Sequence, residues 1–435
     1  MRVLILAEEC NPDWPSAPIF AYQSARAITE HADVVLVTQV RNARNIERAG
    51  LGRARVVYLN TEKVARPLWK LSVALRRGTE TGWLMAGALA YPGHFAFEWL
   101  AAKYFRGALQ RGEFDLVHRL SPWSGVQPSF MATASPIPFL LGPINDNLPW
   151  MSESTDMLKR EATRADRLAS FFLPLLRHLP YQRSKYIHAN GVLACYDHTI
   201  DSLPDAVKAK TVNFPEVGID PEVFGLASRP RSGRMTVLFV GRLVPLKLPE
   251  VIIRAFGASS ILRQQRLVIV GEGPERPRLE SLVAENGLAA SVELTGLKSH
   301  AEVGQFMRQG DIFAFPSAHE MGGGVVVEAM ACGLACVVVD FGGPATLIGP
   351  ERGVKVPVGN VTQLSVSFRH ELEQLVTQPE RITQLGLAAH RHAMTHYTWD
   401  VKARKTLEVY RWVTGRRARK PDFWDPAFAE ANSGQ

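Results

Sequence analysis

Short apolar runs alternate with longer helix-like stretches along most of this chain, and this alternation limits the possible folds more than any other feature. In the first half the runs are Val3–Leu6, Val34–Val37, Val56–Leu59, Leu116–His118, Pro138–Leu141 and Gly191–Ala194. In the second half they are Val237–Val240, Leu267–Val270, Val292–Leu294, Ile312–Phe315 and Cys336–Val339. Strands of this length that are separated by helices predict βα units and parallel sheets buried on both faces.

The chain also shows where two domains meet. Its 435 residues exceed the length that one hydrophobic core usually serves. Residues 215–234 contain three prolines and three glycines and show little periodicity, and a new strand follows them. We therefore predict an α/β protein with two doubly wound domains, over about 1–220 and 235–395.

The end of the chain returns to a helical pattern before it loses periodicity. Apolar residues at helical spacing predict a helix at 397–415, which we expect to pack back on the first domain. Basic residues followed by proline and small residues predict a loosely ordered tail over 416–435.

Composition excludes several classes of protein. Four cysteines in this length cannot form a disulfide framework, so we expect a reducing compartment. The most apolar long stretch, 83–105, contains Pro92, Glu98 and Lys103, so it does not predict a membrane span. The run Val3–Leu6 is too short for a secretory signal, and these features together predict a cytoplasmic protein.

The positive charge of the chain has a local source. The net charge of +8 favours anionic partners, and residues 41–111 hold 13 Lys or Arg against 4 Asp or Glu. Because aromatic residues are mixed with these cations, the region suits an anionic membrane surface or a lipid-diphosphate acceptor. The alternative is a pair of core helices with a solvated basic face. We expect no nucleic-acid partner, since no recognised binding module accompanies the region.

A glycine and two cations follow the strand that ends at Val240. Gly241 permits a sharp turn at the carboxyl end of a strand, where ligands bind open α/β sheets. Arg242 and Lys247 flank this turn, and a guanidinium with an ammonium suits a diphosphate whose charge grows as it leaves. Pro249 fits the first turn of the next helix. The alternative is a solvated basic loop.

Three consecutive glycines mark a second candidate loop. Gly322, Gly323 and Gly324 predict a loop rather than a helix interior, with a helix that begins near Val325 and ends at Gly333. The backbone N–H groups of the loop and the N-terminus of the helix together predict an anion site.

Two carboxylates border the glycine loop. Glu320 lies just before it, and Glu328 lies one turn into the helix. Carboxylates facing a phosphate would repel it, so we expect both to accept hydrogen bonds from sugar hydroxyls. The alternative is that Glu328 only complements the helix dipole and Glu320 is a surface charge.

These residues resemble family 4 of the retaining glycosyltransferases. The motifs that carry the resemblance occur in the order found in that family and are Gly241–Lys247, Val270–Pro274, Asp311–Ser317, the pair Glu320 and Glu328, and Gly342–Pro344. The similarity is continuous over about 235–415 and thin over 1–230. It implies the GT-B fold, in which two Rossmann-like domains face each other across a cleft and the second holds most of the nucleotide sugar.

The resemblance also implies roles for individual residues. Arg242 and Lys247, on the turn that begins at Gly241, would contact the donor diphosphate. Glu320 would hold hydroxyls of the donor sugar, and Glu328 would bind the nucleotide ribose.

Two further elements of the site follow from the resemblance. The N–H groups of Gly322–Gly324 would lie near the sugar and phosphate. His118 would approach the donor sugar from the first domain. The family transfers the sugar with retention by front-face attack, so we assign no general base.

Three positions depart from the family pattern. Residues 10–18 read CNPDWPSAP where the family often has a Gly-Gly turn, and Leu120 stands where a second histidine is common. Thr346 stands where an acidic residue is common. None of these changes removes the donor site, whereas the first two affect the acceptor side.

The expected function is therefore a metal-independent hexosyltransferase that uses a nucleoside-diphosphate sugar as co-substrate. No Asp-x-Asp motif occurs, so cationic side chains and a helix end, rather than Mg²⁺, would neutralise the diphosphate. The expected acceptor is a sugar, lipid-linked or polysaccharide intermediate, with the protein peripheral at the inner face of the membrane. The alternatives are a catalytically inactive GT-B scaffold that binds a glycan or partner, and a sugar-nucleotide enzyme such as an epimerase. A dehydrogenase is not favoured, because Gly271–Gly273 lacks the third glycine of the dinucleotide fingerprint.

Overall fold

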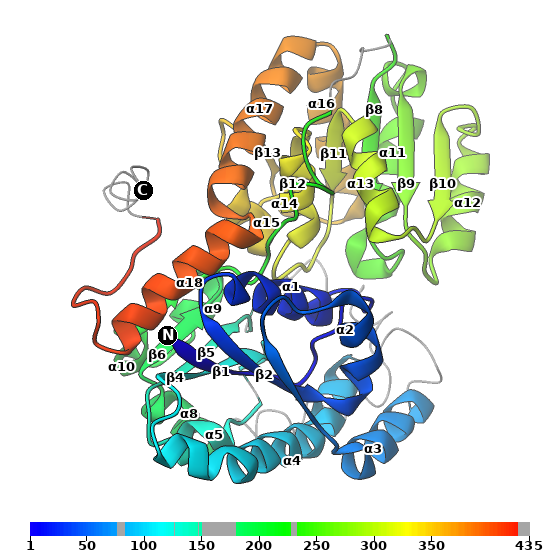
Figure 1. Cartoon of the computed structure of the whole chain (residues 1–435). Coiled ribbons are helices and arrows are strands. Elements are labelled where there is room, and N and C mark those ends of the chain that lie inside the picture. Colours follow the sequence, from blue (N-terminus) through cyan, green and yellow to red (C-terminus); the bar gives the residue numbers. More distant parts are fainter. Residues whose placement is uncertain (76–82, 126, 147, 150–179, 228–232, 425–435) are drawn as a thin grey trace. The chain divides into compact units, whose positions relative to one another are not determined.

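The structure is a computed structural model of the chain and describes residues 1–75, 83–125, 127–146, 148–149, 180–227 and 233–424 (Figure 1). The chain divides into two compact units. Unit 1 comprises Met1–Asn147, Ala162–Glu216 and Trp399–Gln435, and unit 2 comprises Leu148–Glu161 and Val217–Thr398. The long part of unit 2 thus begins within the proline- and glycine-rich segment 215–234.

Unit 1 is built around a seven-stranded sheet whose strand order is β3-β2-β1-β4-β5-β6-β7, with every described pair parallel. The strands are β1 (Arg2–Ala7), β2 (Asp33–Gln39), β3 (Arg55–Leu59), β4 (Leu116–Ser121), β5 (Phe139–Ile144), β6 (Gly191–Ala194) and β7 (Thr211–Asn213). The first six coincide with the predicted runs. The seventh was not predicted, because a short segment of threonine, valine and asparagine carries no apolar run.

Helices cover both faces of this sheet. They are α1 (Ala17–Thr29), α2 (Ala43–Ala49), α3 (Glu62–Leu75), α4 (Trp83–Gln110), α5 (Phe130–Ala134), α8 (Pro180–His188), α9 (Tyr196–Asp201), α10 (Asp205–Lys208) and α18 (Trp399–Val413). Leu4 and Leu6 of β1 enter the core that α4 and α5 share. Val3 and Ile5 enter the core on the other face, with α1, α2 and α18. The strand is apolar throughout because both of its sides are buried.

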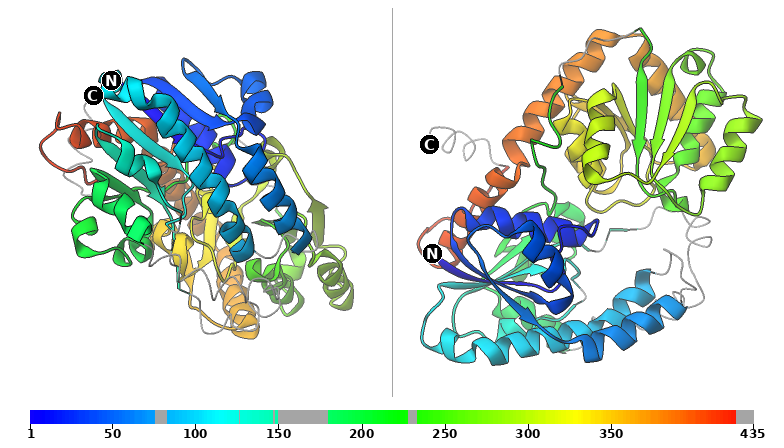
Figure 2. Two further views of the ribbon diagram at one scale, coloured as in Figure 1. Left: turned by 90° about the horizontal axis from the view of Figure 1, so that it is seen from below. Right: turned by 45° about the vertical axis from the view of Figure 1, so that its right-hand side comes forward.

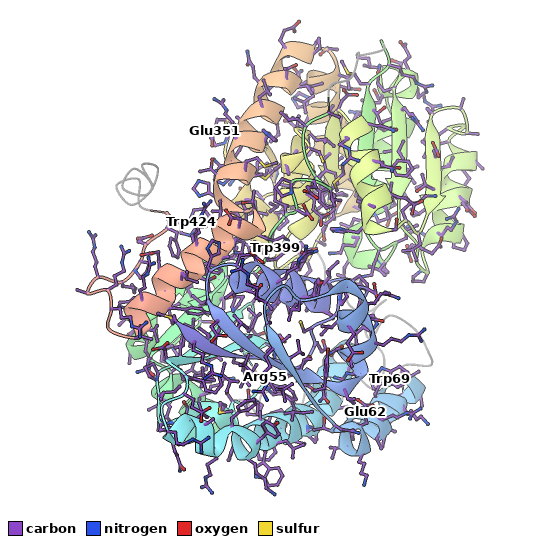
Figure 3. The ribbon with its side chains drawn as sticks, in the orientation of Figure 1. Arg55, Glu62, Trp69, Glu351, Trp399 and Trp424 are labelled. Atoms are coloured by element: carbon purple, nitrogen blue, oxygen red, sulfur yellow. The ribbon has the colours of Figure 1, made fainter. Side chains whose placement is uncertain are left out.

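The residues that follow α18 also pack on unit 1. Phe423 is buried, and its ring centroid lies 5.9 Å from that of Phe214. The indole N–H of Trp424 (labelled in Figure 3) donates to the carbonyl of Asn213 at 3.2 Å. The predicted loose tail at 416–435 is therefore wrong for 416–424, because two aromatic side chains anchor that segment. Residues 425–435 lie outside the described residues.

Unit 2 contains a six-stranded parallel sheet whose strand order is β10-β9-β8-β11-β12-β13. Its strands are β8 (Thr236–Val240), β9 (Arg266–Val270), β10 (Val292–Gly296), β11 (Ile312–Phe315), β12 (Ala335–Val339) and β13 (Gly353–Val356). Its helices are α11 (Pro249–Gly257), α12 (Arg276–Glu285), α13 (His300–Gln309), α14 (Gly324–Ala331), α15 (Gly342–Leu347), α16 (Val361–Val376) and α17 (Pro379–His396).

Both units have the doubly wound topology, and Figure 2 shows helices on both faces of each sheet. In each sheet the first strand lies inside, and the direction of winding reverses beside it, between β1 and β4 in unit 1 and between β8 and β11 in unit 2. The prediction of two Rossmann-like, doubly wound parallel-sheet domains is confirmed. In open α/β sheets, ligands bind at the carboxyl ends of the strands beside such a reversal.

No helix in the described ranges combines the length and the apolar character that a bilayer crossing requires.

Candidate functional site

Loops from three strands of unit 2 meet beside its reversal point. The N–H of Gly343, after β12, donates to the carbonyl of Glu320, after β11, at 3.0 Å. The N–H of Ala318 donates to the carbonyl of Leu246, after β8, at 2.8 Å. A Cβ atom on Gly343 would lie only 2.4 Å from the carbonyl oxygen of Met321. The loops therefore pack backbone against backbone, and glycine is needed at this contact.

The loop after β9 supports the turn after β8 in the same way. Gly271 has φ +148°, and a Cβ atom there would lie 1.9 Å from the carbonyl oxygen of Gly241. Gly273 has φ +158°, and a Cβ atom there would lie 2.4 Å from the carbonyl oxygen of Leu243. Glycine is the residue that tolerates both the backbone angles and this proximity. The Gly-Glu-Gly sequence is thus explained by packing rather than by dinucleotide binding.

The basic turn places one predicted cation on the surface and the other in a half-buried position. Arg242 is exposed at the start of the turn. A short 3₁₀ helix ends at Lys247, and the left-handed residue Leu248 (φ 49°) then precedes Pro249 at the first position of α11. The Nζ atom of Lys247 lies 5.5 Å from the centroid of the Phe315 ring at the end of β11. The predicted helix start at Pro249 is confirmed.

Lys247 and Glu320 form an ion pair between the loops after β8 and β11. The Nζ atom of Lys247 donates to Oε2 of Glu320. The N–H groups of Gly322 and Gly323 donate to Oε1 at 3.3 and 3.1 Å. Burial would raise the pKa of Glu320, but Lys247 and the two amides outweigh it, so the pKa is lowered. Glu320 is therefore an ionised acceptor held by three donors.

The glycine loop begins helix α14 as the sequence indicates. Gly323 occupies the N-cap position in the left-handed conformation, with φ +76°, and the helix begins at Gly324, one residue before the predicted start. Gly333 follows the helix with φ +75°, as predicted for a left-handed cap. Because two of the amides predicted to lie near a ligand donate to Glu320, that carboxylate orders the loop in this structure.

Glu328 is buried in α14 and contacts a residue that sequence reasoning did not find. Its Oε1 lies 3.2 Å from Nε2 of His300, the first residue of α13. Burial would lower the pKa of His300, but the hydrogen bond to Glu328 outweighs it and the pKa is raised. The ring of Phe224 meets the same histidine edge to face at 4.8 Å. The capping box formed by Ser299 and Glu302 marks the start of this helix, but only the tertiary fold brings His300 to Glu328.

His118 is completely buried in β4 of unit 1. Its Nε2 lies 2.7 Å from the carbonyl oxygen of Gly142, and its Nδ1 lies 2.7 Å from the hydroxyl of Tyr410. Burial lowers the pKa of His118 to about 4. The imidazole is therefore neutral at pH 7, with Nε2 donating to the carbonyl and Nδ1 accepting from the hydroxyl. A role in contacting a donor sugar stays a prediction, and it would require His118 to exchange one of these partners.

A cavity beside His118 contains polar groups that the sequence did not indicate. Its lining includes Trp123, Glu216 and Lys402. Within the described part of the chain, neither Oε2 of Glu216 nor Nε1 of Trp123 has a hydrogen-bond partner. The ammonium of Lys402 donates to the carbonyl of Pro215. Burial lowers the pKa of Lys402 to about 7 and raises that of Glu216.

A second buried cluster of titratable groups follows β1. Nδ1 of His94 lies 2.8 Å from Oε2 of Glu8, and its Nε2 lies 3.1 Å from the carbonyl of Pro128 and 3.4 Å from Oε1 of Glu98. Burial would lower the pKa of His94, but the two carboxylates outweigh it and raise the pKa to about 9. Neither in this cluster nor in the other described residues is a group of three His, Cys, Asp or Glu side chains arranged to hold a metal ion.

Comparison with known proteins finds sequence similarity between this chain and glycosyltransferases. Residues 227–389 match the family model described as glycosyl transferases group 1. The chain is 34% identical over 236 residues to a D-inositol 3-phosphate glycosyltransferase of Stackebrandtia nassauensis. The aligned region covers 50% of this chain and 51% of that protein. It is 29% identical over 260 residues to a GDP-mannose-dependent alpha-mannosyltransferase of Mycobacterium tuberculosis. That aligned region covers 57% of this chain and 64% of that protein. The chain therefore spans about half to two thirds of the length of these relatives.

Solved structures match both units. The structure of Anabaena HepE in complex with UDP has a TM-score of 0.63 and 16% identity, covering 94% of this chain and 99% of that one. The sucrose-phosphate synthase of Thermosynechococcus elongatus has a TM-score of 0.62 and 16% identity, and the match covers 96% of this chain and 100% of that one. At these identities the likeness concerns the fold. The chain thus has the GT-B fold, and its residues 227–389 carry the sequence signature of the group 1 glycosyl transferases.

Proposed function

We propose that this protein is a retaining glycosyltransferase, which moves a hexose from a nucleoside-diphosphate sugar to an acceptor hydroxyl without a metal ion. The observation that carries the proposal is the ion pair of Lys247 and Glu320 beside the reversal of the unit 2 sheet. A cation and a carboxylate that lie side by side suit a ligand in which a phosphate is joined directly to a hydroxyl-bearing ring.

The cationic part of the site would act on the leaving diphosphate. Cleavage of the bond between the sugar and the phosphate leaves additional negative charge on the departing oxygen. The ammonium of Lys247 lies within the turn after β8, and the exposed guanidinium of Arg242 begins that turn at Gly241. Cations placed where charge develops stabilise the transition state more than the ground state.

The acidic part of the site would orient the donor. Glu320 is fixed by the amides of Gly322 and Gly323, so its carboxylate can accept hydrogen bonds from sugar hydroxyls without reorganising. Glu328 would accept from the ribose hydroxyls, with His300 holding its carboxylate. Gly324 begins the helix whose N-terminus would favour the phosphate.

The compared proteins support this choice of ligand. HepE binds UDP and UDP-glucose in its solved complexes, and one relative is named for its dependence on GDP-mannose. Retention and metal independence rest on the resemblance to family 4 of the retaining glycosyltransferases and on the cationic turn. The proposed acceptor is a lipid-linked or polysaccharide intermediate at the cytoplasmic face of the membrane.

A donor-turnover assay tests the proposal. Wild-type protein is incubated with a panel of UDP- and GDP-sugars in EDTA, and nucleotide release is measured together with the anomeric configuration of the freed or transferred sugar. We expect release with retention, and a fall of about 100-fold or more in Lys247→Met and in Glu320→Gln. The matched control is the ion pair of Arg266 and Glu293 (2.6 Å), so Arg266→Met and Glu293→Gln should keep the wild-type rate.

Two results would contradict the proposal. Isomerisation of the sugar without release of the nucleotide would identify a sugar-nucleotide epimerase. Nucleotide-sugar binding without release, with or without added acceptors, would identify an inactive scaffold.

A further inference from the structure

Helices α3 and α4 of unit 1 expose many large apolar and basic side chains (Figure 3). The two helices pack closely, since a Cβ atom on Gly93 of α4 would lie 3.3 Å from Cβ of Ala65 on α3. We call their exposed side the α3–α4 surface. Its members are Lys63, Val64, Arg66, Trp69, Lys70, Leu71, Leu75, Phe95, Trp99, Lys103 and Arg106.

Helix α3 carries two stripes on this surface. Val64, Leu71 and Leu75 are spaced by seven and four residues, so they line one side of the helix, and each is 40–45% exposed. Lys63, Arg66 and Lys70 are spaced by three and four residues and line another side. Trp69, labelled in Figure 3, is 63% exposed next to the basic stripe. A helix with exposed apolar and basic stripes suits the boundary between water and lipid.

Helix α4 continues the same chemistry. Phe95, Trp99 and Lys103 recur every four residues on an exposed side, and Nζ of Lys103 lies 5.4 Å from the centroid of the Trp99 ring. Arg106 lies on the same side and is also exposed. Tryptophan prefers the headgroup level of a bilayer, because its ring is apolar at one end and polar at the other.

Basic residues outnumber acidic residues on the two helices that form this surface. In the sequence of α3 and α4 the acidic residues are Glu62 and Glu98. Glu62 pairs with Arg41 at 3.2 Å, and Glu98 is buried beside His94. A second copy of this chain on the same surface would bring like charges together, whereas an anionic partner would neutralise them.

The α3 part of the α3–α4 surface extends past the carboxyl edge of the unit 1 sheet. His94 of α4 contacts Glu8, the residue directly after β1, and the core residues of α4 begin at Phe97. The helix begins at Trp83, and its first turns and α3 lie beyond the strand ends (Figure 2). A flat partner can therefore reach α3 without meeting the sheet.

We propose that the α3–α4 surface docks unit 1 on an anionic lipid bilayer. The aromatic and leucine side chains would enter the headgroup region, while the lysines and arginines would contact anionic headgroups. The proposal deepens the proposed function by giving a lipid-linked acceptor a place of presentation, and it rests on that function for its purpose. Vesicle binding itself needs no donor turnover, so the two proposals fail independently.

Co-sedimentation of the full chain with vesicles tests the docking surface. Vesicles of phosphatidylcholine with about 30% phosphatidylglycerol are compared with pure phosphatidylcholine at low and high salt. We expect binding to the anionic vesicles, weakened by salt. The double variant Arg66→Glu/Lys70→Glu should bind at least about 30-fold more weakly, since each cation near the surface contributes about fivefold.

Matched variants separate the surface from general charge and hydrophobicity. Arg381→Glu/Arg391→Glu on α17 changes the net charge equally and should bind as wild type does. Trp69→Ser/Leu71→Ser should also bind weakly, whereas Val366→Ser/Leu387→Ser, which changes two similarly exposed apolar residues of α16 and α17, should bind normally. Thermal unfolding of each variant confirms that it is folded.

Three outcomes would overturn the proposal. In the first, the wild type binds neutral and anionic vesicles equally. In the second, Arg66→Glu/Lys70→Glu and Arg381→Glu/Arg391→Glu weaken binding equally. In the third, the wild type is a dimer that does not bind vesicles, and Trp69→Ser/Leu71→Ser dissociates it. The last outcome would make the surface an interface between two copies of the chain.

Discussion

Lys247 and Glu320 form an ion pair within unit 2 although 73 residues separate them in the chain. They meet because β8 and β11 are neighbours in the sheet, with Val237 opposite Ile312, and because each residue lies in the loop that follows its strand. Each charge is thus already neutralised before a ligand arrives. A phosphate and a sugar hydroxyl would replace existing partners rather than meet isolated charges.

The first prediction concerns the stability of this pair. Lys247→Met leaves the carboxylate of Glu320 with two amide donors and no counterion, so we expect the free energy of unfolding to fall by about 1–3 kcal/mol. Glu320→Gln removes the charge that Lys247 neutralises and should also destabilise. The free energy of unfolding of the double variant should fall by clearly less than the sum of the two single losses. Urea unfolding of the wild type and the three variants measures this. Strictly additive losses would show that the two side chains are not coupled.

The second prediction concerns the backbone contact between the loops after β8 and β9. Gly271→Ala places a methyl group against the carbonyl of Gly241, so we expect a loss of about 2–4 kcal/mol in the free energy of unfolding. Gly287→Ala is the matched control, because Gly287 also has a positive φ (+62°) but no atom within 4 Å of the added methyl group. It should cost only about 1 kcal/mol. Equal losses in the two variants would remove the packing explanation.

The third prediction concerns pH and the buried His94. Its pKa of about 9 lies above the ordinary value of 6.5, so its stabilisation is complete below about pH 6.5 and is lost as pH rises toward 9. The free-energy difference between wild type and His94→Gln should therefore shrink by about 3 kcal/mol from pH 6 to pH 10. Denaturant unfolding at a series of pH values measures it, with the exposed His370→Gln as control. A difference that does not change with pH would refute a charged His94.

The fourth prediction concerns Lys402 and has the opposite sign. Its pKa of about 7 lies below the ordinary value of 10.5, so its burial costs stability in full below about pH 7 and less as pH rises toward 10.5. Lys402→Met escapes this cost. Its stability relative to wild type should therefore be about 3 kcal/mol more favourable at pH 6 than at pH 9, measured by the same unfolding series. The contrary result is a relative stability that is constant or rises with pH.

The strands were predictable because parallel strands buried on both faces appear as continuous apolar runs. β6 and β11 match the predicted runs residue for residue, at Gly191–Ala194 and Ile312–Phe315. β7 and β13 escaped prediction because they are short, and threonine, asparagine, glycine and lysine interrupt their apolar character.

The candidate site was predictable where it depends on local chain geometry. Glycines at Gly241 and Gly323 mark the turns at strand ends and at a helix start, and the adjoining charged residues follow from them. His300, Glu216 and Lys402 were not predictable, because their contacts join elements distant in the chain. The order of 416–424 was missed for the same reason, since Phe423 packs on Phe214, more than 200 residues away.

Thermal unfolding in EDTA with added nucleotides tests the central claim most directly, because a ligand that binds the native state raises the melting temperature. We predict that UDP or GDP, and the matching nucleotide sugar, stabilise the wild type and Arg266→Met by several degrees. Lys247→Met should lose most of that shift. Stabilisation by NAD in place of these nucleotides, or a full UDP or GDP shift in Lys247→Met, would contradict the account.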